Sequence, residues 1–192
     1  NMMSGPRLQP LQQRLATNLA GIESMSLSSN SIASGYFTEL AIEHPDGTEE
    51  RYPELEFDTD TSFFSTMHIH LVEGLQPADA LKKYGTSFYI NERYARLKNV
   101  SSEDFGQKTL QDILPRVRVK YILTGMIENY PTASLQKEIN PQRITVRDSG
   151  DTYLGQIGKY VLIRLQPEKR KATLERIERI WKEMFNGQDL VY

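Results

Sequence analysis

Cysteine is absent from all 192 residues of the chain. This absence excludes disulfide bonds, thiol nucleophiles and thiolate metal sites, and it leaves the cellular compartment open. A long apolar run is also lacking, because no stretch approaches the roughly 20 apolar residues that span a bilayer. Residues 1–6 lack the apolar core of a signal peptide. Because Met2 follows an Asn, we interpret residues 1–7 as a cut, disordered edge that precedes the folded domain.

A surplus of positive charge is lacking too. Lys and Arg total 23 against 25 Asp and Glu, which gives a formal net charge of -2. Proteins that bind nucleic acid normally carry a basic surplus that contacts phosphates. The only compact basic run is Lys169-Arg170-Lys171, and acidic residues resume at Glu175. We therefore expect no nucleic-acid partner.

Catalytic sequence motifs are missing as well. No serine lies in a Gly-x-Ser-x-Gly elbow, and no Gly-x-x-x-x-Gly-Lys loop is present to cradle phosphates. Gly150, Gly155 and Gly158 are close together, but we expect them to precede a strand rather than to open a helix. A phosphate cradle needs backbone amides at a helix N-terminus, so these glycines indicate a flexible hairpin loop. The sequence predicts a chain that is not an enzyme and holds no cofactor.

Two histidines are candidates for metal ligands. His68 and His70 are two residues apart, which on a strand would place both side chains on one face. A third ligand would have to come from elsewhere, such as Glu73 or His44, and no motif specifies one. Histidines at a sheet edge are more often ordinary polar surface. We therefore predict no metal site.

An acidic run follows the first strong turn signal and comprises Glu49, Glu50, Glu54, Glu56, Asp58 and Asp60. Its alternation along a strand is typical of a solvated edge face. A glycosidase would instead need two carboxylates on opposite walls of a cleft. The chain also has ten tyrosines. Tyrosines suit carbohydrate-binding or protein-binding surfaces and equally the rim of a hydrophobic core.

The apolar pattern predicts one core with irregularly alternating helices and strands. Hydrophobic residues make up 39% of the chain, enough for a core. Residues 8–20 have the periodicity of an amphipathic helix that stops at Gly21. Strands at 37–43 and 51–57 flank the turn 44–47 and form a hairpin. The segment 23–34 has no clear pattern.

The remaining expected elements are a helix capped by residues 60–61, strands at 69–72 and 87–90, helices at 77–82 and 92–98, a longest strand at 117–127, a helix at 134–139, and strands at 143–146 and 160–165. The last strand is almost entirely apolar, which predicts a central position in a sheet. A closing helix at 169–186 carries an apolar stripe that includes Trp181. The fold class is α+β, a mixed sheet packed against helices, with a possible inserted β-rich lobe at about 34–58.

Several segments, taken in order, resemble the extracytoplasmic core domain of MacB-like and FtsX-like ABC transporter permeases. They are the short helix and Glu-Gly strand at 63–74, the Asn-Glu helix start at 88–93, the acidic turn at 103–108, the Gly-containing strand at 121–130, the Ser-Leu segment at 134–141, and the closing strand, Pro turn and Trp helix at 160–181. Leu75 stands where that family often has Arg, and 128–130 replaces a Lys-Asp-Phe type run. The resemblance covers residues 8–192, as a single extracytoplasmic domain.

The resemblance implies a non-catalytic domain on the periplasmic side of the inner membrane. Such a domain binds a partner or substrate and transmits movement from membrane helices. The implied partners are the transmembrane helices of the same permease, a cytoplasmic ATPase subunit or domain, and a periplasmic adaptor or lipoprotein. Both ends of the chain would then return to one membrane surface.

Two other functions stay open at this point. One is a hydrolase of envelope glycans or peptides, with a cleft built from the acidic run and tyrosines. The other is a stand-alone periplasmic binding protein. A cleft with two facing carboxylates would favour the first, and the sequence flanking this chain would decide the second.

Overall fold

A computed structural model describes residues 8–18, 20–31, 37–131 and 138–190. The helices are α1 (Leu8–Asn18), α2 (Phe63–Met67), α3 (Pro77–Tyr84), α4 (Glu92–Lys98), α5 (Leu110–Ile113), α6 (Thr152–Ile157) and α7 (Arg170–Met184). The strands are β1 (Ile22–Ser28), β2 (Phe37–Glu43), β3 (Glu49–Asp60), β4 (Leu71–Gly74), β5 (Ser87–Asn91), β6 (Ile122–Ile127), β7 (Gln142–Arg147) and β8 (Tyr160–Leu165). Within these residues no helix is long and apolar enough to cross a membrane.

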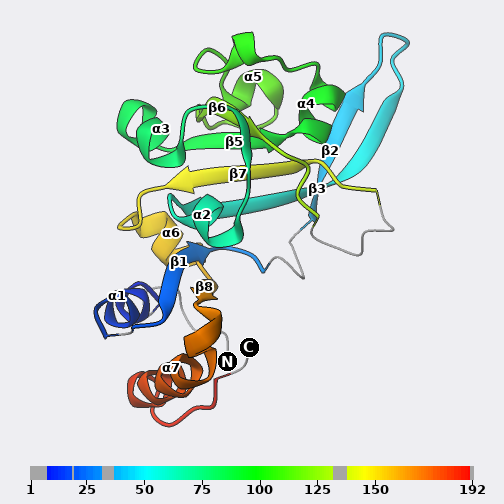
Figure 1. The fold of residues 1–192 in the computed structure, drawn as a ribbon. Coiled ribbons are helices and arrows are strands. Elements are labelled where there is room, and N and C mark those ends of the chain that lie inside the picture. Colours follow the sequence, from blue (N-terminus) through cyan, green and yellow to red (C-terminus); the bar gives the residue numbers. More distant parts are fainter. Residues whose placement is uncertain (1–7, 19, 32–36, 132–137, 191–192) are drawn as a thin grey trace.

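One mixed sheet holds these strands in the order β4-β6-β5-β7-β3-β1-β8, with β2 paired only to β3 (Figure 1). The pairs β3–β7 and β5–β6 are parallel, and the other pairs are antiparallel. The α+β class predicted from the sequence is confirmed. The β-rich segment expected at about 34–58 is the β2–β3 hairpin, which is continuous with the sheet because β3 goes on to pair with β7.

The long strand β3 connects the hairpin to the body of the sheet. Its first half pairs with β2 from Glu49 to Leu55, and its second half pairs with β7 from Leu55 to Asp60. The turn between β2 and β3 closes as predicted, with the Gly47 amide donating to the His44 carbonyl at 2.9 Å. Gly47 has φ +82°, a left-handed conformation that glycine adopts without strain. The hairpin forms an arm at the end of the molecule remote from α7 (Figure 1).

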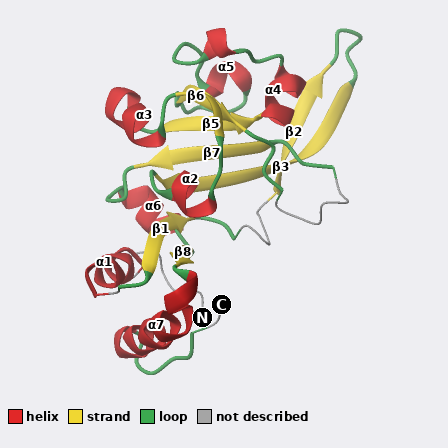
Figure 2. Ribbon diagram, in the orientation of Figure 1, coloured by secondary structure: helices red, strands yellow, loops and turns green. Residues whose placement is uncertain are grey.

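Helices cover both faces of the main sheet, which we define as β4, β6, β5, β7 and β3 (Figure 2). Tyr89 of β5 faces a cluster with residues of α2 and α3, whereas its neighbours Phe88 and Ile90 face a second cluster with residues of α4 and α5. This is the alternation that a strand buried on both faces requires. All residues of β5 and β7 are buried.

A third hydrophobic cluster lies apart from these two, in a part that we call the terminal layer: α1, β1, β8 and α7. Strands β1 and β8 pair over their full length, from Ile22 with Leu165 to Ser28 with Tyr160. Leu27 of β1 and the alternate residues of β8 that begin at Val161 pack against α1 and α7 on one face. The expected closing helix with its apolar stripe is α7, and it anchors this layer rather than the main sheet.

Several sequence predictions were wrong in detail. Segment 23–34, left without an assignment, contains most of β1. The longest strand is β3, and the strand predicted at 117–127 begins only at Ile122. Strand β8 lies at the edge of the sheet rather than at its centre. Its residues are apolar because one face packs against α1 and α7, and Leu162 on the other face packs against the cluster of the main sheet. The helix predicted at 134–139 falls largely outside the described residues.

Two further corrections concern loops. Ser62 rather than Asp60 or Thr61 precedes α2 as its N-cap residue. The segment with Gly150, Gly155 and Gly158 is not a hairpin loop, because it contains α6, whose first turn is capped by the Asp151 side chain accepting from the Leu154 amide at 2.8 Å. Gly155 is buried in this helix, where an added Cβ would lie 3.1 Å from the Gln9 side chain of α1. Close packing against α1 accounts for that glycine.

Candidate functional site

The predicted histidine pair does not lie on a strand. His68 ends α2 in a left-handed conformation with φ 53°, and β4 begins only at Leu71. The expected common face for His68 and His70 is therefore wrong. His44 lies in the hairpin turn, where its Nε2 is 3.5 Å from Glu50. Among the described residues no group of three or more His, Asp or Glu side chains could hold a metal ion.

The acidic run does not form a solvated edge. Glu54, Asp58 and Asp60 are all buried. The half of β3 that holds Asp58 and Asp60 is interior, with β7 on one side and β1 on the other, and Glu54 lies opposite Thr38 of β2. Only the start of the run, at Glu49 and Glu50, is exposed. The sequence of β7 contained an indication that these carboxylates are buried, because two arginines alternate there with apolar residues.

Those two arginines neutralise the buried carboxylates of β3. Arg143 donates from Nε to Glu54 at 2.8 Å, and its terminal nitrogen lies 2.8 Å from Glu56. Arg147 donates from Nε to Asp58 at 2.6 Å. The strands β3 and β7 are parallel and in register, so every second residue of each strand meets on one face. We call these contacts the ion-pair ladder.

Burial and charge act against each other in the ladder. Burial raises the pKa of the Glu54 carboxyl, and Arg143 opposes that rise. Burial likewise raises the pKa of Asp58, against the effect of Arg147. Burial would lower the pKa of Arg143, but Glu54 and Glu56 more than offset it and raise the pKa of this guanidinium. A buried pair of this kind contributes little net stability, while loss of one member leaves an uncompensated charge.

Arg147 is also held between two aromatic rings. Its guanidinium carbon lies 5.0 Å from the Tyr121 ring centroid and 4.5 Å from that of Tyr153, within range of a cation–π interaction. Its terminal nitrogen donates to the Tyr121 hydroxyl at 3.0 Å. Tyr153 belongs to α6 and is half exposed. The ladder thus ends in contacts that fix α6 against the sheet.

The ladder does not have the arrangement that a hydrolase requires. Glu54 and Glu56 share one guanidinium instead of facing each other across a cleft. Two pockets on the described surface, beside α7 and beside α4, are lined by other side chains. The carboxylates that suggested a glycan hydrolase therefore have a structural explanation.

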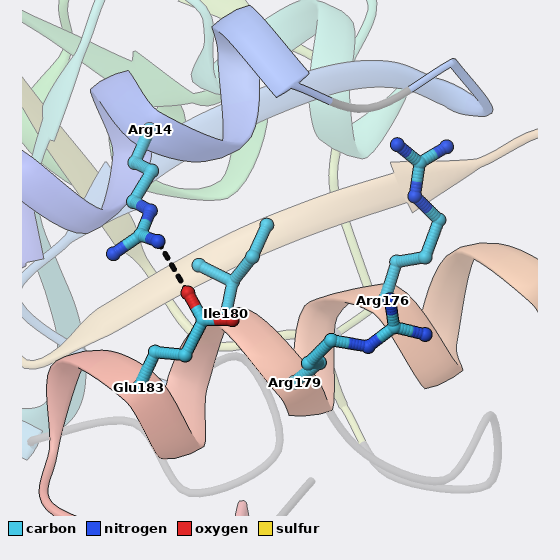
Figure 3. Close-up of a pocket in the computed structure, with 5 residues that line it drawn as sticks. All are labelled: Arg14, Arg176, Arg179, Ile180 and Glu183. Atoms are coloured by element: carbon cyan, nitrogen blue, oxygen red, sulfur yellow. Dashed lines mark hydrogen bonds and ion pairs between the residues drawn. The ribbon is translucent and has the colours of Figure 1, made fainter.

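The terminal layer brings the two ends of the described chain together. Leu8, the first residue of α1, and Leu190, the last described residue, belong to the same hydrophobic cluster. Arg14 of α1 and Glu183 of α7 form an ion pair between the two helices, seen as the dashed line in Figure 3. Helices α1 and α7 lie next to each other at the end of the molecule opposite the hairpin arm (Figure 1). This is the arrangement expected if both ends return to one side of the fold.

The joint between the terminal layer and the main sheet is narrow. Strands β1 and β3 pair at one position, Ser28 with Thr59. Asp60 strengthens the joint, since its carboxylate accepts from the Ser26 hydroxyl at 2.8 Å, from the Leu27 amide at 2.9 Å and from the Gln12 side chain at 3.0 Å. One buried carboxylate therefore links the end of β3 to both β1 and α1. The sequence analysis assigned Asp60 to a helix cap and missed this role.

A second contact links β8 to the body of the fold. Arg164 donates from Nε to the Thr66 carbonyl at the end of α2, at 2.7 Å. On the α1 side, the Gln9 side chain donates to the Ser149 carbonyl at 2.7 Å. The joint thus combines these polar contacts with the packing of Leu162 of β8 against the cluster of the main sheet. Each part on either side of the joint also has its own hydrophobic cluster.

Two of the pockets on the described surface are open to solvent. The first, of about 220 Å³, lies between α1 and α7 and is lined by Arg14, Arg176, Arg179, Ile180 and Glu183 (Figure 3). The second, of about 390 Å³, lies beside α4 and β6. None of the arginines in the first pocket was singled out from the sequence, because they are spaced along α7 among acidic residues and come together with Arg14 only through packing.

Comparisons with known proteins find likeness in structure alone. No protein-family model matches the chain, and no curated protein has significant sequence similarity to it. Solved structures that share its fold include the following three. The extracellular domain of the noncanonic ABC-type transporter YknZ from Gram-positive bacteria has a TM-score of 0.58 and 10% identity over 94% of this chain and 84% of that domain.

The periplasmic region of MacB from Actinobacillus actinomycetemcomitans has a TM-score of 0.59 and 8% identity, over 93% of this chain and 74% of that one. A domain from Porphyromonas gingivalis, described as part of a permease protein, has a TM-score of 0.51 and 13% identity over 94% of this chain and 69% of that one. The resemblance seen in the sequence is confirmed in the fold: this chain has the architecture of the extracytoplasmic domains of MacB-like ABC transporter permeases.

Proposed function

We propose that the chain is a non-catalytic extracytoplasmic domain of an ABC transporter permease, located on the outer side of the inner membrane. It would act together with the transmembrane helices of the same permease and a cytoplasmic ATPase subunit or domain. The shared fold with the YknZ and MacB domains, over more than nine-tenths of this chain, supports this assignment. Its role is to carry movement from the membrane to a partner, such as a periplasmic adaptor or lipoprotein, or to a substrate.

The placement of α1 and α7 is the observation that carries the proposal. The two helices are far apart in sequence, yet they share one hydrophobic cluster and an interhelical ion pair. In a permease they would be the elements nearest the membrane. A change in the separation of two membrane helices would then act directly on the α1–α7 contact.

The narrow joint suggests how this movement reaches the rest of the domain. The terminal layer has its own cluster and is connected to the main sheet by one β-bridge position, by the contacts of Asp60, Arg164 and Gln9, and by the packing of Leu162. A small displacement of α1 against α7 would tilt the main sheet as one unit, because tightly packed parts move as rigid bodies. The hairpin arm, at the opposite end, would travel furthest (Figure 1).

Reversible thiol cross-linking in the full-length permease tests this function. Since the chain contains no cysteine, the pair Arg14→Cys and Glu183→Cys can be joined by a short cleavable bis-maleimide without side reactions in this domain. We expect the cross-link to abolish ATP-driven transport and cleavage of the linker to restore it. The readout is transport activity before and after cleavage.

A matched control joins two positions away from the terminal layer. Ala41 of β2 and Arg51 of β3 are direct cross-strand partners in the hairpin, so joining Ala41→Cys to Arg51→Cys leaves α1 and α7 free. Transport should survive this second cross-link. Full transport with α1 and α7 joined would disprove the proposal, as would thiol labelling of the Arg14→Cys variant only from the cytoplasmic side.

A further inference from the structure

The chain just before β6 alternates like a strand but has no partner strand. Residues 116–121, which we call the basic segment, have the sequence Arg-Val-Arg-Val-Lys-Tyr and contain no acidic residue. Val117 and Tyr121 pack against the hydrophobic cluster that holds residues of α4 and α5. The three cationic residues of the segment are exposed. This alternation is typical of an extended chain, and it agrees with the strand that the sequence predicted there.

The backbone of the basic segment is bonded along one edge. Val117 and Tyr121 form backbone hydrogen bonds of 2.9 and 2.8 Å with the C-cap residue and the first residue of α5. From Val117 onward the segment contains no turn or bend. In an extended chain the backbone groups of successive residues point to opposite edges. The amide and carbonyl groups of Arg118 and Lys120 therefore lie at the edge that faces away from α5.

This outer edge is open. Within the residues that the structure describes, the amide and carbonyl groups of Arg118, Val119 and Lys120 form no hydrogen bond with another backbone group. The Val119 side chain is 36% exposed and adds an apolar contact. A row of unpaired N–H and C=O groups on an exposed extended chain is a template for an additional strand.

The positive charge of the basic segment is offset only in part by its neighbours. Arg116 lies 3.8 Å from Glu49 of β3, a long contact for an ion pair. Lys120 acts electrostatically on Asp112 of α5. Arg118, between them, forms no ion pair with any residue that the structure describes. The centre of the segment thus presents an exposed guanidinium to which the described part of the chain supplies no anion.

We infer that the basic segment pairs with an extended, acidic segment of a partner protein. In this mode of recognition the backbone hydrogen bonds hold the added strand, and the alternate side chains select it. Acidic side chains at every second position of the partner would lie opposite the exposed cations, which stabilises a strand pair. A second copy of this chain would instead place cations opposite cations, which destabilises the pair.

The position of the segment suits a partner site. Helix α5 and the hairpin arm lie at the end of the molecule remote from α7 (Figure 1). The contact between Arg116 and Glu49 places the segment beside that arm. That the partner is an extracytoplasmic protein rests on the proposed function, in which this end of the domain travels furthest. A partner bound here would receive the largest displacement.

Nuclear magnetic resonance of backbone amides tests the site on the 192-residue chain. The probe is a capped peptide of alternating Glu and Val residues, the Glu peptide; the other arms are the same peptide with Gln for Glu, and vesicles that contain phosphatidylglycerol. We expect saturable shifts in the basic segment with the Glu peptide and clearly weaker binding of the Gln peptide. Hydrogen exchange of the Arg118 and Lys120 amides should slow in the complex. Equal affinity for the Gln peptide would overturn the acidic partner, and stronger binding to the vesicles would assign the segment to a membrane surface instead.

A modified peptide separates strand pairing from simple attraction of charge. Methylation of alternate backbone nitrogens in the Glu peptide removes its hydrogen-bond donors and keeps its charge. We expect this peptide to lose binding, because the added strand is held through its backbone. Equal affinity for the methylated peptide, or binding without slower exchange at Arg118 and Lys120, would show that no strand is added.

Two arginine variants provide a matched control. Arg118→Gln should weaken binding of the Glu peptide about threefold, the effect expected when one cross-strand charge pair is lost. Arg96→Gln removes an equally exposed type of charge from α4, outside the segment, and should leave the affinity unchanged. If both variants weaken binding equally, the peptide is attracted by the general charge of the surface and the segment is not the site.

Failure of this inference and failure of the proposed function give different results. Absence of saturable shifts with the Glu peptide removes the strand site and leaves the cross-linking result intact. A chain that binds the peptide with slower amide exchange, but whose α1–α7 cross-link has no effect on transport, retains the site and loses the transmission role.

Discussion

The main sheet and the terminal layer bury their side chains to very different extents. Strands β5 and β7 are buried along their whole length, whereas β8 is only partly buried and begins at an exposed Tyr160. Within α7 only Thr173 and Ile177 are buried. Since burial of apolar surface is the dominant stabilising contribution, most of the free energy of folding resides in the main sheet. The terminal layer is the part that can shift or open at low cost.

The same contrast holds for ion pairs. Arg143 and Glu54 are each less than one-tenth exposed, whereas Arg14 and Glu183 are each more than two-fifths exposed. A buried ion pair holds the neighbouring strands in place because breaking it costs several kcal/mol. An exposed ion pair can form and break with little change in the free energy of unfolding. The two regions therefore differ in how firmly their ion pairs hold the surrounding elements.

The largest effect should follow removal of one buried charge from the main sheet. Arg143→Met leaves the Glu54 carboxylate buried without its partner and should lower the free energy of unfolding by about 3–5 kcal/mol. Urea denaturation followed by circular dichroism measures this loss. Adding Glu54→Met to the same chain should recover most of the stability. If the single variant is as stable as the parent, the ladder is not a constraint on the main sheet.

Alkaline pH should weaken the main sheet through Tyr89. Burial raises the pKa of this phenol from 10.0 to about 12, and its hydroxyl donates to the Leu75 carbonyl at 2.9 Å. Below pH 10 the phenol is neutral in both states, so its contribution to stability is complete there. Between the two pKa values the unfolded chain loses this proton and the folded chain keeps it, which reduces stability by up to about 2.7 kcal/mol.

Stability measured at several alkaline pH values tests this dependence. Tyr89→Phe should make the decline shallower, while Tyr160→Phe, on the exposed start of β8, should leave it unchanged. Burial also raises the pKa of Tyr94, so part of the decline should remain in Tyr89→Phe. A decline of equal slope in Tyr89→Phe would assign the alkaline sensitivity to other groups.

A substitution of intermediate effect should show whether the terminal layer unfolds at a lower urea concentration than the main sheet. Trp181 is the only tryptophan and lies in α7, so its fluorescence reports the terminal layer, whereas circular dichroism reports mainly the rest. Ile177 is buried in α7, and Ile177→Val should cost about 0.5–1.5 kcal/mol and shift the fluorescence transition to lower urea more than the dichroism transition. Ile144→Val, in β7, should shift both together. Coincident transitions in all three chains would mean that the molecule unfolds as one unit.

The smallest effect is expected from the ion pair between α1 and α7. Both partners are well exposed to solvent, so Arg14→Met should change stability by about 0–1 kcal/mol. A double-mutant cycle with Glu183→Gln measures the coupling energy between the two side chains. A coupling above about 2 kcal/mol would contradict the view that α1 and α7 are lightly joined.

The sequence predicted local structure well where the local signal was strong. The helices at α3 and α4, strand β5 and the Pro-Asp-Gly turn were found because proline, glycine and capping residues mark their ends. The sequence analysis placed β8 at the centre of the sheet, and β8 is an edge strand. It placed the acidic run on a solvated edge, and most of that run is buried in β3. Hydrophobicity records whether a residue is covered, and it does not distinguish cover by neighbouring strands from cover by helices such as α1 and α7.

The candidate site was harder to predict than the fold. Asp60 accepts from four donors, and three of them, in residues 12, 26 and 27, are remote in sequence, so no local pattern identifies Asp60 as the joint. The arginine pocket likewise depends on α1 meeting α7. By contrast, Arg143 and Arg147 alternate in a buried strand opposite Glu54 and Asp58, and pairing the two patterns would have revealed the ladder.

The pairing of β1 with β8 has a consequence for the order of folding. Residues 37–147 contain the hairpin and every strand of the main sheet, so this part can assemble while the chain is still being synthesised. Strand β1 is made early, but its long partner is β8, at residues 160–165, and until then β1 has only the bridge at Thr59 and the hydrogen bonds to Asp60. The first helix and strand must therefore wait for β8 and α7 to emerge. A ribosome that stalls before residue 160 would leave the apolar faces of α1 and β1 uncovered, as a ready binding site for chaperones.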